Sequence, residues 1–282
     1  MSLIAHRPGR WIDPRSGGEI GHSDLLHRMA TKQAVMLGET HNRYDVHRWQ
    51  LHVTAGLHAL RPDLAVGFEM FPRSVQSVLD AWVAGELDAE AFLEKVEWKT
   101  VWNFPPELYL PLFHFCRQFR VPMLALNCRR ALVTEVGKVG WDAIPIEDRD
   151  GVTPAKDASE GYRKYLFDIL SGMRARDANY TTSPEFARFV RAQQTWDRAF
   201  ACGIADALSK PNPPLVVGII GRGHLEYGHG TPYQLADLGI LDTAVLLPSD
   251  DDTFDGTARC GIADAVFRLD TNDVAPMPDR RG

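Results

Sequence analysis

Short apolar runs rich in β-branched residues, each bounded by turn residues, recur along the chain. They cover residues 34–37, 65–68, 122–126, 215–220, 244–247 and 265–269. Most show no polar alternation, which is typical of strands whose two faces are both covered by helices. Helical patterns lie between them, at residues 45–60, 72–84, 88–96, 105–119, 157–170, 184–208 and 232–238. The sequence therefore predicts an α/β fold with a largely parallel sheet flanked by helices.

The chain of 282 residues is predicted to form a single domain, residues 1–282, because it contains no internal repeat, low-complexity tract or break in composition. A hydrophobic content of 45% is enough to fill a sizeable core. The third and fourth apolar runs are too far apart for one crossover helix. A mainly helical insertion is therefore expected, with helical elaborations at about 72–120 and 141–210.

Composition narrows the range of partners. A formal net charge of −6 and a pI near 5.9 disfavour a nucleic-acid partner, which requires clustered Lys and Arg. The 4 cysteines are widely spaced and form no CxxC pair, so neither a zinc knuckle nor a disulfide framework is predicted.

No apolar run reaches the roughly 20 residues of a membrane span. The chain as given predicts a cytoplasmic protein, or a periplasmic or lipid-anchored one if a native leader has been removed, and a homodimer stays open.

Polar or ionisable residues follow the first four apolar runs. The first run continues into "GETH", the second ends at Glu69, the third is followed by Asn127 and Arg129, and the fourth continues into "GRGH". In open parallel sheets, ligands bind in the crevice beyond the carboxyl ends of the strands. We therefore expect a site at this edge, built from Glu39, His41, Glu69 and His224.

Two of these stretches share one form, Gly-x-x-His directly after an apolar run, in which glycine allows the backbone to turn sharply. A simple helix entry is the alternative for Glu39, since a carboxylate is favourable near a helix N-terminus. His47 lies on a polar stripe beside the apolar stripe of the 45–60 helix. It can point toward the strand ends or remain a histidine at the edge of the core.

The 184–208 helix carries Gln193 and Asp197 in the middle of its predicted apolar face. A buried amide and a buried carboxylate need hydrogen-bond partners. We expect both residues, together with Asn127, to support the site, and a purely structural pair is the alternative. The aromatic residues of segment 97–115 are expected mainly to pack in the core, while some of them wall a flat ligand.

Several motifs, taken in order, resemble the ChaN family of haem-binding uptake proteins: "LGETHN…H", "GFEMFPR", "ALN", "QQTWDRAFA" and "GRGHLEYGHGTPYQL". The resemblance runs from about Trp11 to Leu238 and extends to the Tiki, TraB and erythromycin-esterase groups. It implies haem binding and iron uptake or handling, often by a lipid-anchored protein, although the chain as given shows no lipid-attachment leader. The wider superfamily includes ester and peptide hydrolases. The motif match carries over Glu39, His41, Glu69 and His224 as the core of the site.

The first hypothesis that follows is a haem-binding protein. The resemblance implies a tyrosine ligand for the iron, and Tyr227, inside the second Gly-x-x-His motif, is the predicted position. Tyr44 and Tyr233 are the alternatives, and a site histidine such as His47 can also take the axial position. Arginines near the strand ends are expected to pair with the haem propionates: Arg129 and Arg222.

The second hypothesis is a hydrolase of esters or peptides, so whether the chain is an enzyme stays open. His41 or His224, oriented by Glu39 or Glu69, would act as general base on water. In a metal-dependent version, these residues would bind a divalent ion. The absence of a GxSxG motif disfavours a serine nucleophile. A third interpretation is that the cluster persists only as a hydrogen-bonded structural network.

Overall fold

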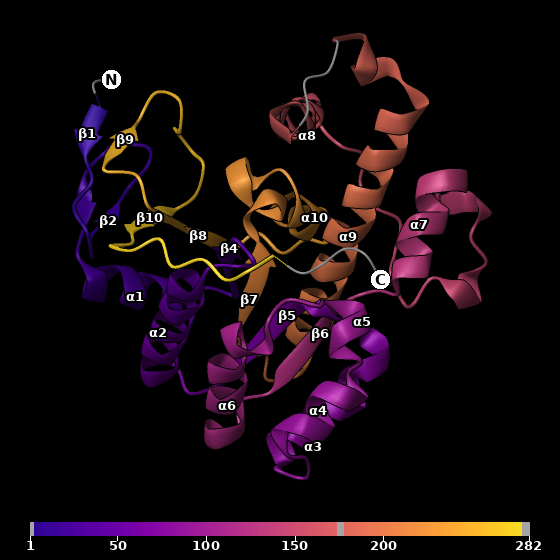
Figure 1. Cartoon of the computed structure of the whole chain (residues 1–282), viewed down its shortest axis with the longest axis horizontal. Helices are drawn as coiled ribbons and strands as arrows, with labels where there is room; N and C mark the ends of the chain where they lie inside the picture. Colours follow the sequence, from indigo (N-terminus) through magenta and orange to yellow (C-terminus); the bar gives the residue numbers. More distant parts are fainter. Residues whose placement is uncertain (1–2, 174–177, 278–282) are drawn as a thin grey trace.

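A computed structural model describes residues 3–173 and 178–277 of the chain (Figure 1). Its centre is an 8-stranded sheet with the order β3-β2-β10-β8-β4-β7-β5-β6. The strands are β2 (Trp11–Ile12), β3 (Glu19–Ile20), β4 (Ala34–Glu39), β5 (Leu64–Pro72), β6 (Met123–Asn127), β7 (Leu215–Gly221), β8 (Thr243–Ser249) and β10 (Ala265–Arg268). A separate antiparallel pair joins β1 (Leu3–Ala5) to β9 (Thr253–Asp255).

The sheet is largely parallel, as predicted. Strand β4 pairs in parallel with β7 and β8, β5 pairs in parallel with β6 and β7, and β10 pairs in parallel with β8. The short strands β2 and β3 are antiparallel additions at one edge. Each predicted apolar run corresponds to one of these strands, so the α/β fold class is confirmed.

Helices cover both faces of the sheet. They are α1 (His22–Ala30), α2 (Tyr44–Leu60), α3 (Gln76–Ala84), α4 (Ala89–Lys95), α5 (Trp98–Val101), α6 (Leu110–Phe119), α7 (Arg130–Val139), α8 (Glu160–Met173), α9 (Pro184–Leu208) and α10 (Thr231–Asp237). Short 3₁₀ turns connect them, namely η1 (Arg73–Val75), η2 (Pro106–Leu108), η3 (Trp141–Ala143), η4 (Ile146–Asp148), η5 (Ala178–Thr182), η6 (Arg222–His224) and η7 (Glu226–Gly228). Helices α1, α5 and α7 were not predicted. No helix in residues 3–173 and 178–277 is long and apolar enough to cross a membrane.

The two faces of β4 explain why its sequence is apolar throughout. Val35 and Leu37 point into the core beneath α2 and α6, whereas Ala34 and Met36 point into the core beneath α9 and α10. Successive side chains of a strand face opposite sides of the sheet, so a strand covered on both sides needs apolar residues at every position.

Helix α8 packs apart from these two cores. Its apolar side chains Tyr162 and Leu166 meet Phe186 and Val190 at the start of α9 in a small separate cluster. In Figure 1, α8 stands beside the upper end of α9, away from the strands. Ser183 begins α9 by accepting a hydrogen bond from the Phe186 amide, and Pro184 occupies the first turn.

Candidate functional site

The carboxyl ends of β4, β5 and β7 bring two buried carboxylates to one edge of the sheet. Glu39 is the last residue of β4 and lies opposite Gly221 of β7. Glu69 comes from β5, directly after Phe68, which lies opposite Ile219. Glu39 and Glu69 are only 1% and 2% exposed. Removing two carboxylates from water requires charged or hydrogen-bonding partners, which the surrounding chain supplies.

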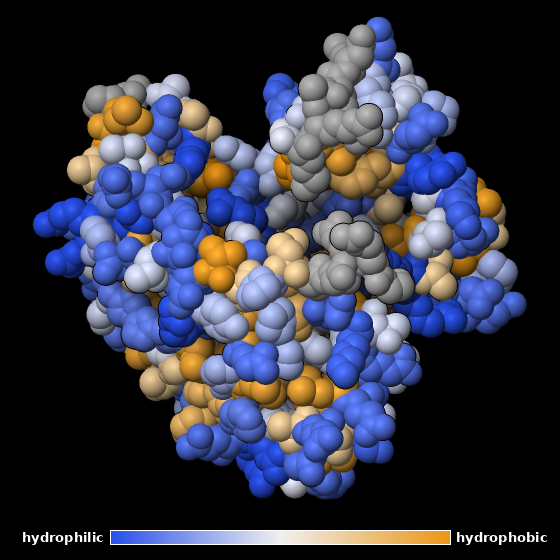
Figure 2. Space-filling view, viewed as in Figure 1, coloured by the Kyte–Doolittle hydropathy of each residue, from blue (hydrophilic) through white to orange (hydrophobic). Residues whose placement is uncertain are grey.

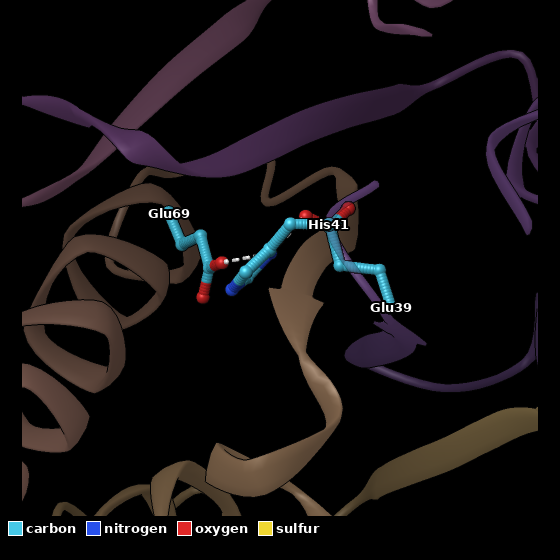
Figure 3. Close-up of side chains that lie close together, drawn as sticks. All are labelled: Glu39, His41 and Glu69. Atoms are coloured by element: carbon cyan, nitrogen blue, oxygen red, sulfur yellow. Dashed lines mark hydrogen bonds and ion pairs between the residues drawn. The ribbon is translucent and has the colours of Figure 1, made fainter. Parts of the chain in front are cut away.

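His41 lies between the two carboxylates (Figure 3). Its Nδ1 atom is 2.7 Å from Oε1 of Glu39 and 3.3 Å from Oε1 of Glu69. Burial lowers the pKa of His41, but the charge of Glu69 and the hydrogen bond and charge of Glu39 outweigh it and raise the pKa to about 9. The side chain is still 36% exposed, so a ligand can reach the ring.

Glu39 is held as an anion by several donors. The hydroxyl of Tyr109 donates to Oε1 at 2.9 Å, and the Gln50 amide donates to Oε2 at 3.2 Å. Burial raises the pKa of Glu39, but the imidazoles of His47 and His41 and the hydrogen bond from Tyr109 lower it below its usual value. We call Glu39, His41 and Tyr109 the His41 group.

The surroundings of Glu69 favour its protonated form, in contrast to those of Glu39. Its Oε2 atom accepts a hydrogen bond from the Gly221 amide at 2.8 Å, whereas the buried Oε1 atom has no hydrogen-bond partner. Burial, reinforced by the charge of Glu39, raises the pKa of Glu69 despite the nearby His41. The surroundings therefore push the pKa values of the two carboxylates apart, which is the usual arrangement of an acid and a base in one site.

A second histidine repeats this arrangement. The Nδ1 atom of His224, in η6, is 2.8 Å from Oδ1 of Asp197 on α9, and the Tyr162 hydroxyl donates to Oδ2 at 2.6 Å. Asp197 is fully buried. Burial lowers the pKa of His224, but Asp197 outweighs it and the pKa is raised. We call Asp197, His224 and Tyr162 the His224 group.

Glycines pack closely against residues at both histidines. A Cβ atom at Gly221 would lie 3.0 Å from Cε1 of His41, and one at Gly230 would lie 2.4 Å from the carbonyl oxygen of His224. At Gly38, a Cβ atom would meet the Leu247 side chain at 2.2 Å. Gly38 and Gly221, the first residues of the two Gly-x-x-His motifs, do not have positive φ angles. Close packing, rather than the sharp turn expected from the sequence, is therefore the reason for glycine at these two positions.

Three of the predicted metal ligands lie together. Glu39, His41 and Glu69 each offer one ligand atom, and these atoms lie within 4.8 Å of one another. The unbonded Oε1 atom of Glu69 gives this group an oxygen that is not already engaged in a hydrogen bond. Two carboxylates and one imidazole suit a divalent transition metal. His224, the fourth predicted ligand, is not part of this group and turns its Nδ1 atom to Asp197.

The predicted haem-binding residues are more scattered. His47 is buried, and its two ring nitrogens face the Gln50 side chain and the His41 carbonyl, which leaves neither nitrogen for an iron. The Tyr227 hydroxyl donates to the Ala258 carbonyl at 3.2 Å. The ion-pair partners of the remaining two residues are Glu226 for Arg222, and Asp148 and Asp150 for Arg129.

The predicted supporting residues differ in their surroundings. The Asn127 amide donates to the Glu69 carbonyl at 2.7 Å and so fixes the end of β5. Gln193 is only half-buried. The buried amide of this helix is instead that of the next residue, Gln194, which donates to the Lys156 carbonyl. The prediction that Gln193 lies on the buried face was therefore wrong, whereas Asp197 is buried as predicted.

Tyr109 and Tyr162 are the site residues that sequence reasoning missed. Tyr109 falls in the aromatic segment that was expected to fill the core or wall a ligand, and it does lie in the core. Its second role depends on which group its hydroxyl meets, which no local pattern encodes. Trp102 and Phe104 of the same segment lie beside the His41 ring, at centroid distances of 4.8 and 5.4 Å.

The protein is of the α/β class, with a largely parallel sheet whose carboxyl edge carries carboxylate–histidine pairs. The model of the family described as "Haem-binding uptake, Tiki superfamily, ChaN" matches residues 25–235, and the chain belongs to this family. Its fold is similar to that of ChaN of Campylobacter jejuni, in a structure described as showing cofacial heme binding. The TM-score is 0.72 and the identity 19%, over 91% of this chain and 95% of that one.

A variant of erythromycin esterase is more distantly similar, with a TM-score of 0.49 and 11% identity over 88% of this chain and 77% of that one. No curated protein gives a significant match.

Proposed function

We propose that this chain binds haem at the carboxyl edge of the sheet, with Tyr227 as the iron ligand. Membership of the ChaN family supports haem as the ligand. The observation that carries the position is a group of donor side chains just beyond β7. The rings of Tyr165, Tyr227 and His229 lie between 5.9 and 6.0 Å from one another.

The chemistry of this donor group fits a ferric porphyrin. Phenolate and imidazole are both established axial ligands of haem iron, and the aromatic faces can pack against the macrocycle. Burial lowers the pKa of His229, so its ring is neutral at neutral pH and has a lone pair available. Burial raises the pKa of Tyr227, so ligation by its oxygen requires release of the phenol proton. Haem would supply the ferric charge that favours this release.

Arg222 is the better placed of the two predicted propionate partners. It belongs to the same segment as Tyr227, pairs with Glu226 and is 38% exposed. A propionate would compete with Glu226 for this guanidinium. Arg129 lies before α7 and is paired with Asp150 at 2.8 Å.

A titration of metal-stripped protein with ferric haem tests the proposal. We expect a saturable Soret band at stoichiometric haem, lost in Tyr227→Phe. Tyr233→Phe is the matched control, because Tyr233 also follows β7 but its ring lies against Lys156 at 4.8 Å. A featureless spectrum would exclude specific binding, and loss of the band in His41→Ala alone would assign the ligand to His41.

A second function, hydrolysis of an ester or peptide, is favoured by the opposite pKa shifts of Glu39 and Glu69. In this reading, ionised Glu39 orients His41, and protonated Glu69 faces the same ring as a proton donor. In a metal-dependent version Glu69 would instead be ionised, and Glu39, His41 and Glu69 would hold a divalent ion that acidifies a bound water.

Ester and peptide substrates, screened after chelator treatment and again with added Zn²⁺ or Mn²⁺, test this second function. Hydrolysis should be lost in Glu69→Gln and His41→Ala and kept in Tyr227→Phe, which is the reverse of the pattern expected for haem binding. If Glu39→Gln and Glu69→Gln reduce only stability, the cluster is a structural network.

A further inference from the structure

Two buried tyrosines each donate a hydrogen bond to a site carboxylate, but they lie in different parts of the fold. Tyr109 and Tyr162 are each 1% exposed, and each donates to the carboxylate that holds a site histidine. Tyr109 belongs to the large core beneath the sheet. Tyr162 belongs to α8, whose buried apolar side chains pack in the small cluster with the start of α9 and whose tyrosine rings also meet Tyr227 and His229.

In the described part of the chain, α8 meets the site through hydrogen bonds and ring contacts rather than through the main core. Beside the Tyr162 bond, the Tyr165 hydroxyl donates to Glu226 at 2.9 Å, and Gly161 packs against the His229 ring so closely that a Cβ atom would lie 2.9 Å from Cε1. On its outer side, a surface cavity of about 240 Å³ lies between Arg163, Phe186 and neighbouring residues. Elements with few buried apolar contacts open at a lower free energy than the rest of a fold.

The bond from Tyr162 links α8 directly to the carboxylate that holds His224. Its acceptor is a fully buried carboxylate, and hydrogen bonds to charged groups contribute more than neutral ones. The other oxygen of Asp197 is already engaged by His224, and the Thr231 hydroxyl lies 3.4 Å away. Loss of Tyr162 would therefore leave Oδ2 of Asp197 buried without a partner.

We propose that α8 is a closing element of the site and that Tyr162 is a positioning residue, which acts on His224 through Asp197. When α8 is docked, Asp197 is satisfied on both oxygens and the His224 ring is fixed. When α8 undocks, Asp197 loses a donor and His224 is free to reorient. The two events are coupled in both directions, as any linked pair of equilibria must be.

The surface is consistent with such a movement. Figure 2 shows a hollow between the side of the molecule that carries β1 and β9 and the side that carries α8 and α9. Helix α8 borders this hollow, so its release would widen access to the strand ends. The inference goes beyond the proposed function and is independent of which ligand the site holds.

The test compares Tyr162→Phe with Tyr165→Phe, which removes a hydroxyl from the same helix, three residues along, without touching Asp197. Hydrogen exchange reports the opening of residues 160–172, and ring ¹⁵N resonances report His224. In Tyr162→Phe, we expect exchange of α8 amides to rise roughly tenfold or more, and the Nδ1 resonance of His224 to shift. In Tyr165→Phe, exchange should rise less and His224 should not change.

A change on the other side of the bond tests the coupling. Asp197→Asn keeps the size of the side chain but removes the charge that Tyr162 binds, so it should raise exchange in α8 from outside that helix. Amides of β4 and β7 show in each variant whether the fold is intact. The proposal fails if Tyr162→Phe leaves α8 exchange unchanged, if His224 does not respond, or if Asp197→Asn has no effect on α8. None of these readouts requires haem or a substrate, so failure of the proposed function would not affect them.

Discussion

The His41 group and the His224 group contain the same three components in the same order. In each, a tyrosine donates to a buried carboxylate, which holds the Nδ1 atom of a histidine at 2.7 or 2.8 Å. They differ in what holds the tyrosine. Tyr109 is fixed in the main core, whereas Tyr162 depends on a lightly packed helix. The same set of hydrogen bonds is therefore held by the main core in the His41 group, whereas in the His224 group it depends on the position of α8.

The electrostatic surroundings add a second difference. His41 lies beside two carboxylates, Glu39 and Glu69. The carboxylate paired with His224 is Asp197, and the charges of Glu69 and His41 act on its pKa more weakly. The charge of His41 opposes protonation of His224. The pKa is raised for both rings, by two neighbouring carboxylates at His41 and mainly by Asp197 at His224.

The largest expected effect comes from removing a carboxylate. Glu39→Ala should lower the free energy of unfolding by about 3–5 kcal/mol, because it removes the buried carboxylate that pairs with His41 and accepts hydrogen bonds from Tyr109 and Gln50. Asp197→Ala should cost less, because α8 can move away and let water reach the gap. Urea denaturation measures both losses. Equal losses would mean that the two groups are equally rigid.

Removing only the hydroxyl of Tyr109 or of Tyr162 tests how firmly each tyrosine is held by its surroundings. Tyr109→Phe should lower the free energy of unfolding by about 1.5–3 kcal/mol, the range for a hydrogen bond to a charged group. Tyr162→Phe should lower it less, since part of the loss is absorbed by local opening of α8. Urea denaturation of the whole chain gives these values. A larger decrease in the free energy of unfolding for Tyr162→Phe than for Tyr109→Phe would contradict the view that Tyr162 is the less firmly held of the two tyrosines.

The sequence predicted the sheet and much of its carboxyl edge, for a clear physical reason. A central strand such as β4 must be apolar on both faces, so the run stands out, and the polar residues after it mark where the strand ends. Strand-end reasoning therefore selected Glu39, His41 and Glu69, which the structure has side by side. The strands β2 and β3, each of 2 residues, are too short to give such a signal.

Contacts between distant segments could not be predicted in this way. The partner of the Tyr162 hydroxyl lies 35 residues away in the sequence, and that of Tyr109 lies 70 residues away. Helical periodicity also becomes less exact over a helix of 25 residues, so the sequence pattern predicts Gln193 on the buried face, where the structure has Gln194. Apolar pattern locates the edge of the sheet, but only the folded chain shows which hydroxyl meets which carboxylate.

Added volume tests how each histidine is seated. Gly221→Ala places a Cβ atom 3.0 Å from Cε1 of His41, and this partly exposed ring can shift. Gly230→Ala places one 2.4 Å from a backbone oxygen of His224 and 2.6 Å from Asp197, where less can move. Both should destabilise by about 1–3 kcal/mol, with Gly230→Ala at the upper end. Thermal unfolding ranks the two variants, and the reverse order would show that the His41 ring is the more tightly held.

The smallest expected effect is a dependence of stability on pH that comes from His41. Its pKa rises from 6.5 to about 9 on folding, so its stabilising contribution is complete below pH 6.5 and is lost as the pH rises through about 9. The free energy of unfolding should therefore fall across this interval, by a modest amount because the ring is partly exposed to solvent. Urea midpoints of chelator-treated protein at several pH values would show the slope, and His41→Gln should flatten it. An equal slope in protein and variant would place the titrating group elsewhere, and His224→Gln would then show whether the other histidine carries it.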